Sequence, residues 1–185
     1  MARVRLNETA DLPESHRWIF ERMEQRDGLL NIFRAMSHSP EAMRRFMKFG
    51  SYFLGEGKLD PKLRELAILR AGWLCRAPYE FSQHISFGRR TGLSDDQIRA
   101  IAEPNTRFFD ATEMAVLTYA GEMTTEARVS DATFAAVREF LNEEEIVELT
   151  MVTGFYNMVS RVLNTLEVDI DSPALKDLAE LGLEM

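Results

Sequence analysis

The sequence is poor in thiols and in long apolar runs. Cys75 is its single cysteine among 185 residues, so neither a disulfide within the chain nor a metal site of several cysteines is possible. Arg, Glu or Asn interrupts every apolar stretch before the ~20 residues that a bilayer-spanning helix requires. Residues 1–8 lack the apolar core of a signal peptide. These absences predict a soluble, cytoplasmic protein with no membrane partner.

Positive charge is also in short supply. The chain has 22 Lys and Arg against 30 Asp and Glu, a net charge of -8 at pH 7, and a pI near 5.0. A surface of this sign repels phosphate backbones and anionic lipid headgroups. We therefore expect no nucleic acid among the partners.

The pattern of apolar residues predicts one all-α domain over residues 1–185. Hydrophobic residues make up 45% of the chain, enough to bury a core, and their spacing is helical almost everywhere, without sustained alternation. Trp18, Ile19 and Met23 are expected to face inward from the first helix. Caps, prolines and glycines place helices over about 14–25, 29–36, 40–55, 61–76, 78–91, 95–102, 111–124, 130–140, 143–166 and from 173 onward.

The segment from Glu65 to His84 concentrates groups that transfer protons. Glu80 and His84 are four residues apart, which places them on one face of a helix, and Glu65 comes from the helix before. Burial and a neighbouring carboxylate both raise the pKa of a carboxyl group. We therefore expect a Glu65/Glu80 pair that shares a proton near neutral pH, with His84 as its relay in general acid–base catalysis.

Glu65 also has a structural interpretation. Its carboxylate emerges from an apolar stripe, whereas Lys62 and Arg64 are expected to face elsewhere. A glutamate on an apolar helix face is commonly paired with an arginine. The candidates for such a structural pair are Arg70 and Arg76.

Glu80 and His84 have similar alternatives. Glu80 lies near the start of its helix, where the helix dipole alone favours an acid. His84, between two phenylalanines, also fits a core histidine bonded to a carbonyl. Together with Glu65 they make a poor zinc ligand set, because a second histidine is missing, so no metal is expected.

Residues 63–93 carry a family resemblance. Arg-Glu-Leu-Ala-Ile-Leu-Arg and Gln-His-Ile-Ser-Phe-Gly-Arg-Arg-Thr-Gly-Leu resemble the core of the carboxymuconolactone decarboxylase and alkylhydroperoxidase D-like family. The likeness extends less specifically over residues 29–40 and 154–161. It implies a single-domain alkylhydroperoxidase D-like helical bundle, a homo-oligomer (trimer or hexamer), a small-molecule substrate and no cofactor.

The chain departs from the peroxidase branch of that family at its thiols. The branch has a Glu, eleven residues, Cys-x-x-Cys, three residues and a His; counted from Glu65, the cysteine positions fall on Ala77 and Glu80 and the His on His84. Peroxide reduction requires an attacking thiolate and a resolving thiol. Cys75 lies two positions too early. The resemblance therefore implies the branch without the thiol pair, with Glu65, Glu80 and His84 as catalytic residues.

Candidate substrate-binding residues flank this motif. Tyr79 is positioned to donate a hydrogen bond to a substrate oxygen. An anionic lactone also requires a cation, for which Arg161, Arg70 and Arg76 are unranked candidates. Asn157 and Arg161 belong to a polar stripe on the long 143–166 helix, which forms either a hydrogen-bonded seam between helices or subunits or a pocket wall.

Three functions remain open. The first is a cofactor-free lyase or isomerase that acts on a small carboxylated or carbonyl-bearing ring, possibly a lactone. The second is a noncatalytic binding oligomer, which tolerates replacement of His84. The third is a peroxidase-type antioxidant protein that works through Cys75.

Overall fold

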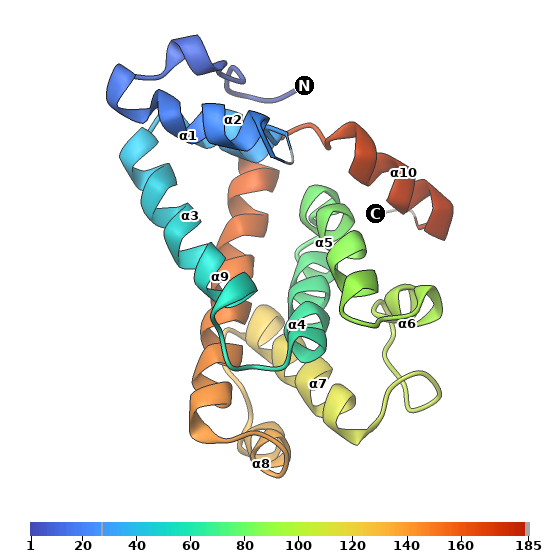
Figure 1. Cartoon of the computed structure of the whole chain (residues 1–185). Coiled ribbons are helices and arrows are strands. Elements are labelled where there is room, and N and C mark those ends of the chain that lie inside the picture. The colour runs from blue at the N-terminus through green and yellow to red at the C-terminus, as the bar shows by residue number, and fades with distance from the viewer. Residues whose placement is uncertain (27, 184–185) are drawn as a thin grey trace.

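The computed structural model describes residues 1–26 and 28–183, and in these ranges it is all-α, as predicted. No strand occurs there, and no described helix combines the length and apolarity needed to cross a bilayer. The elements, drawn in Figure 1, are the 3-10 turn η1 (Thr9–Asp11) and the helices α1 (Glu14–Glu24), α2 (Asn31–Met36), α3 (Pro40–Gly55), α4 (Pro61–Leu74), α5 (Pro78–Arg90), α6 (Asp95–Ala100), α7 (Ala111–Glu126), α8 (Asp131–Arg138), α9 (Glu143–Leu166) and α10 (Ser172–Leu181).

Helix α4 is the centre of the fold. It packs against α5, α7 and α9, and it buries residues on nearly every side. A helix that is covered all round has no solvent face to which a polar side chain can turn. Its charged residues therefore need partners inside the protein. The buried positions are Leu63, Arg64, Glu65, Leu66, Ala67, Ile68, Leu69, Ala71 and Gly72.

The turn between α4 and α5 is set by local sequence, as predicted. Asp60 caps α4 by accepting from two backbone N–H groups, and a proline opens each helix. Arg76 adopts a left-handed conformation with φ 49°, and the N–H of Ala77 donates to the carbonyl of Gly72 at 3.0 Å. A Cβ on Gly72 would lie 3.4 Å from the backbone nitrogen of Phe81. The two helices that carry the motif are thus held close together.

Helices α3 and α9 form an aromatic layer beside this pair. Phe46 and Phe155 have ring centroids 4.9 Å apart, and Phe53 packs on Phe155 at 6.0 Å. A Cβ on Gly50 would lie 3.1 Å from the Phe155 ring, so the helices approach closely there. This layer brings the middle of α9 toward α5.

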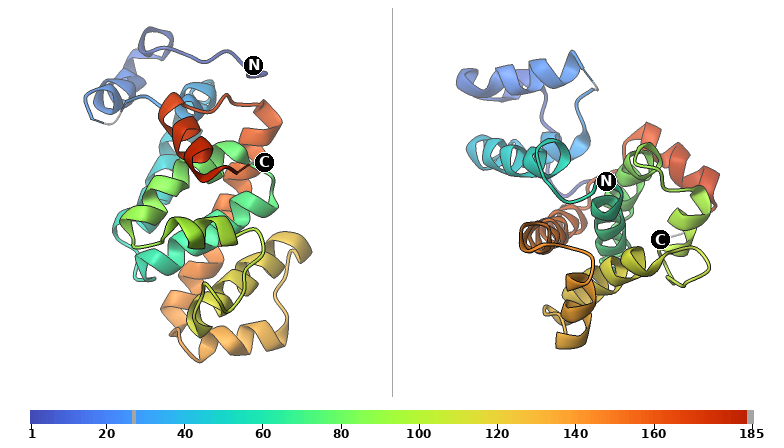
Figure 2. Two further views of the ribbon diagram at one scale, coloured as in Figure 1. Left: turned by 90° about the vertical axis from the view of Figure 1, so that its right-hand side faces the viewer. Right: turned by 60° about the horizontal axis from the view of Figure 1, so that its bottom comes forward.

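The N-terminal segment packs on α3 through a small separate cluster. Figure 2 shows α1 beside α3, at the edge of the bundle. Ile19 and Phe20 of α1 are buried together with Met43 of α3. The prediction that Trp18 faces inward is wrong, because its side chain is 50% exposed. The buried stripe of α1 is narrow, and Trp18 lies beside it.

Candidate active site

The structure brings Glu65, Glu80 and His84 together, with the imidazole in the middle. His84 Nδ1 is 2.7 Å from Glu65 Oε2, and Nε2 is 3.1 Å from Glu80 Oε1. The two carboxylates were expected to share a proton with each other. Instead the His84 ring bridges them, because the spacing of four residues on α5 aims Glu80 at the outer ring nitrogen while α4 supplies Glu65 to the inner one.

Arg64 is an additional member of the cluster. Its Nε donates to Glu65 Oε1 at 3.0 Å, and its Nη1 donates to the carbonyl of Phe53 at 2.9 Å. The prediction that Arg64 faces elsewhere is wrong, since α4 offers it no solvent face. Arg70 donates instead to two carbonyls just after α6, and Arg76 is exposed. Neither of these predicted structural partners is paired with Glu65.

The two carboxylates differ in accessibility. Glu65 is fully buried, and its two oxygens are bound by Arg64 and His84. Glu80 retains 4% exposure, and within residues 1–26 and 28–183 its side chain has only His84 as a partner. Glu65 therefore forms the inner, fixed end of the cluster. Glu80 forms the outer end, with one oxygen available.

The charges of the cluster keep His84 protonated. Burial lowers the pKa of the imidazole, but the nearby charges of Glu65 and Glu80 and their hydrogen bonds outweigh it and raise this pKa to about 9. Arg64, Glu65, His84 and Glu80 then carry alternating charges that sum to zero. At neutral pH both ring nitrogens carry protons, each directed at a carboxylate.

The raised pKa predicts a pH-dependent stability. The folded-state value of about 9 lies above the ordinary 6.5, so this stabilisation is complete below about pH 6.5 and is lost as the pH rises through 9. We expect the free energy of unfolding to fall by about 3 kcal/mol over this window, from 1.36 kcal/mol per pKa unit. Urea unfolding from pH 6 to 10 measures it, with His84→Gln as the control. The same decline in the variant would contradict the assignment to His84.

Two aromatic rings enclose the imidazole. Phe87 stacks on His84 at 5.0 Å between centroids, and Tyr156 of α9 meets it edge-on at 4.8 Å. Burial, together with the charges of Glu80 and Glu65, raises the pKa of the Tyr156 hydroxyl. Among the described residues this hydroxyl has no hydrogen-bond partner. The sequence did not single out Tyr156; the only signal was its place in the weakly family-like segment 154–161.

Tyr79 is engaged elsewhere. Its hydroxyl donates to Asp171 Oδ2, before α10, and accepts from the backbone N–H of Ile32 at 3.1 Å. Burial, followed by Asp171, raises the pKa of Tyr79. Its hydroxyl thus fastens α2 and α10 to α5 and is directed toward Asp171 rather than into the His84 cluster.

Asn157 and Arg161 lie in a second cluster, around Cys75. Asn157 Oδ1 accepts from Arg161 at 2.7 Å and from the Cys75 thiol at 3.5 Å, and its Nδ2 donates to Thr124 at 2.9 Å. The polar stripe therefore forms a seam between helices, beside a shallow hollow of about 600 Å³. Burial raises the pKa of the Cys75 thiol. The structure does not bring these residues to His84.

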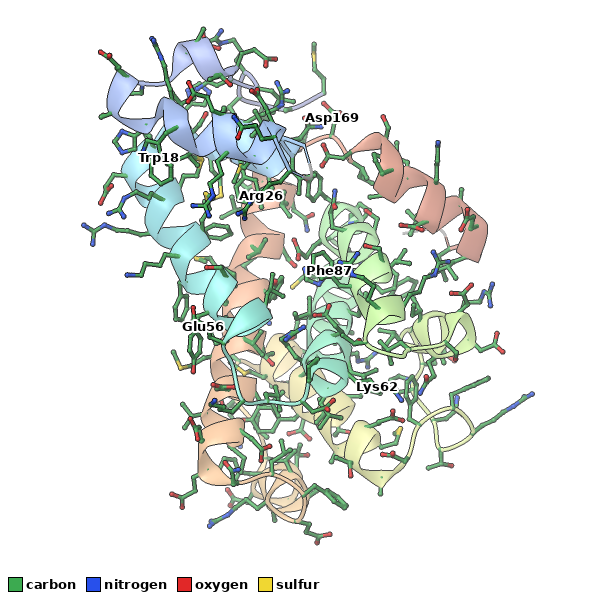
Figure 3. The ribbon with its side chains drawn as sticks, viewed as in Figure 1. Trp18, Arg26, Glu56, Lys62, Phe87 and Asp169 are labelled. Atoms are coloured by element: carbon green, nitrogen blue, oxygen red, sulfur yellow. The ribbon has the colours of Figure 1, made fainter. Side chains whose placement is uncertain are left out.

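A larger groove of about 970 Å³ lies between α1, α3 and α5. Phe87 is part of its wall, and in Figure 3 this side chain extends from α5 while Trp18 and Arg26 extend from α1 and its end. His84 lies directly behind Phe87, separated from the groove by that ring. Across the described ranges, no three His, Cys, Asp or Glu side chains are arranged to hold a metal ion.

Comparison with known proteins confirms the predicted family resemblance. Residues 40–122 match the carboxymuconolactone decarboxylase family. This range contains all four members of the His84 cluster. A comparison with curated proteins gave no match.

Solved structures show the same fold. An uncharacterized peroxidase-related protein of the alkylhydroperoxidase AhpD core from Ralstonia eutropha JMP134 is 21% identical, with a TM-score of 0.81 and 94% of each chain covered. The debrominase Bmp8 in complex with 2,3,4-tribromopyrrole is 19% identical, with a TM-score of 0.82 over 98% of this chain and 100% of that one. An uncharacterized peroxidase-related protein from Silicibacter sp. TM1040 is 23% identical, with a TM-score of 0.80 over 94% and 93%.

Proposed function

We propose, for a chain whose residues 40–122 belong to the carboxymuconolactone decarboxylase family, that the His84 cluster is the proton relay of a cofactor-free lyase or isomerase. Its substrate is a small carboxylated or carbonyl-bearing ring of the lactone type that the family name describes. The observation that carries this proposal is a buried, protonated imidazole held between an enclosed carboxylate and an accessible one.

The resting charge state suits proton donation to carbon. In a decarboxylation, the bond between the ring carbon and the carboxylate breaks, CO2 leaves, and the electron pair moves into the unsaturated lactone carbonyl. The resulting enolate must then take up one proton. His84 holds this proton through neutral pH and passes it by way of Glu80 to the substrate carbon, after which solvent reprotonates the relay.

The other members of the cluster have supporting roles in this scheme. Arg64 and Glu65 hold the inner nitrogen of His84 and so fix the ring orientation, which makes them positioning residues. Tyr156 is assigned the role expected for Tyr79, the donation of a hydrogen bond to the developing enolate oxygen. Its free hydroxyl and its place beside the His84 ring support this assignment.

The experiment that tests this function uses carboxymuconolactone as the probe. The purified protein, with no added cofactor, is expected to release CO2 and, in D2O, to place one deuterium on the carbon that receives the proton. Proton NMR follows both substrate and product. Absence of CO2 release and of deuterium incorporation, with the fold intact, would contradict the proposal for this substrate class.

The thiol alternative has less support. Cys75 contacts Asn157 instead of His84, and burial raises the pKa of its thiol, which disfavours the reactive thiolate. The proposal retains the homo-oligomer that the resemblance implies. Exposed apolar side chains on neighbouring helices support it, and sedimentation velocity tests it; they are Phe49 and Tyr52 of α3 and Val147, Met151 and Met158 of α9.

A further inference from the structure

The groove between α1, α3 and α5 is positively charged in an acidic protein. The chain carries a net charge of -8, yet five of the described residues that line the groove are cationic and one, Asp171, is acidic. A concave surface with one sign of charge concentrates ligands of the opposite sign. The cationic residues are Arg22, Arg26, Arg44, Lys48 and Arg90.

Much of this charge is uncompensated by the protein. Asp171 is occupied, because its Oδ2 accepts hydrogen bonds from Tyr79 and Gln83. Lys48 and Arg90 are exposed, and neither forms an ion pair with any residue in the described ranges. These two cations, one from α3 and one from α5, border the groove from two different helices. An anion between them meets positive charge on both sides.

The walls of the groove also offer aromatic surface. Trp18 is 50% exposed on the α1 side, and Phe87 lines the α5 side. The guanidinium of Arg90 lies over the Phe87 ring, 4.2 Å from its centroid, which holds the charge beside an apolar surface. A half-exposed tryptophan in a cleft gives an aromatic ligand a stacking surface.

We propose that this groove binds a small organic anion with a flat apolar body. The carboxylate interacts with Lys48 and Arg90, and the ring packs against Phe87 and Trp18. This inference deepens the proposed function and rests on it in one respect: the ligand is placed one side chain away from His84, behind Phe87. It names anionic aromatic or unsaturated ring compounds as the substrate class.

Two ligands of equal shape separate charge recognition from apolar burial. Isothermal titration calorimetry at low salt compares 2-naphthoate with its neutral isostere 2-naphthamide. We expect the anion to bind at least ~10-fold more tightly, equivalent to about 1.4 kcal/mol. Added salt should weaken binding of the naphthoate and leave the amide unchanged. Equal affinities for the two ligands would overturn the proposal.

Matched variants locate the site. Lys48→Gln with Arg90→Gln is expected to weaken naphthoate binding at least ~10-fold and to abolish the preference over the amide. The control, Lys176→Gln with Arg138→Gln, removes the same charge from exposed positions on α10 and α8 and should change affinity less than ~2-fold. An equal loss in the control pair would show that only net charge matters, which would overturn the assignment to the groove.

The groove and the relay can fail independently. His84→Gln is expected to bind naphthoate normally, because His84 lies behind the groove wall. If naphthoate and amide bind alike while carboxymuconolactone is turned over, the groove proposal is wrong and the relay stands. If naphthoate binds as expected but no turnover occurs, the proposed reaction is wrong and the anion site stands.

Discussion

Replacement of His84 by glutamine is expected to lower the rate of carboxymuconolactone decarboxylation by at least ~100-fold, the usual contribution of a positioned general acid. Glutamine keeps hydrogen-bonding groups of similar reach but cannot carry the proton that the imidazole holds between Glu65 and Glu80. Steady-state kinetics of CO2 release measures the effect on kcat. The loss should fall on kcat rather than on KM, because His84 lies behind the substrate groove.

Glu80→Gln should reproduce this loss, since it removes the outer end of the relay and leaves His84 in place. A matched control is Glu113→Gln, which removes another buried carboxylate, one that pairs with Lys62 at 2.6 Å outside the cluster. Activity of the wild type should also fall as the pH rises through about 9, where His84 loses its proton. Full turnover in both the His84 and Glu80 variants would contradict the relay.

Replacement of Arg64 by methionine is expected to destabilise the protein by about 3–5 kcal/mol, the typical cost of leaving a buried charge without its partner. Glu65 is fully buried, and Arg64 binds the oxygen that His84 does not. The variant also leaves the carbonyl of Phe53 without its donor. Urea unfolding measures the change. The exposed Arg138→Met serves as a control and should cost less than about 0.5 kcal/mol.

A double-mutant cycle separates charge from packing in this result. Addition of Glu65→Gln to Arg64→Met removes the uncompensated charge, so the double variant should recover much of the stability that the single variant loses. Strictly additive losses would show that Arg64 contributes packing alone. They would contradict its role as the counter-charge of Glu65.

Local sequence signals predicted the framework of the site well. The proline and cap at each helix start placed α4 and α5, and the spacing between Glu80 and His84 correctly put them on one face. Convergence with Glu65 followed from the helix turn between them. These features are short-range, so they are encoded within a few residues of where they act.

The long-range features were not predictable in the same way. Arg64 turns inward because helices distant in sequence cover α4 on every side, and no pattern within α4 reveals this. Tyr156 reaches His84 only through the packing of α9, and the exposure of Trp18 depends on how α1 meets α3. The groove itself joins residues from separate helices, so its charge is visible only in the folded chain.

The protonation of His84 is the claim on which the account depends, and NMR titration of its imidazole measures it directly. The chain has three histidines, so comparison of wild type with His84→Gln assigns the signal. We expect a pKa of about 9, with protons on both ring nitrogens at pH 7. A pKa at or below the ordinary 6.5, with the imidazole neutral at pH 7, would contradict a relay that begins with a proton to donate.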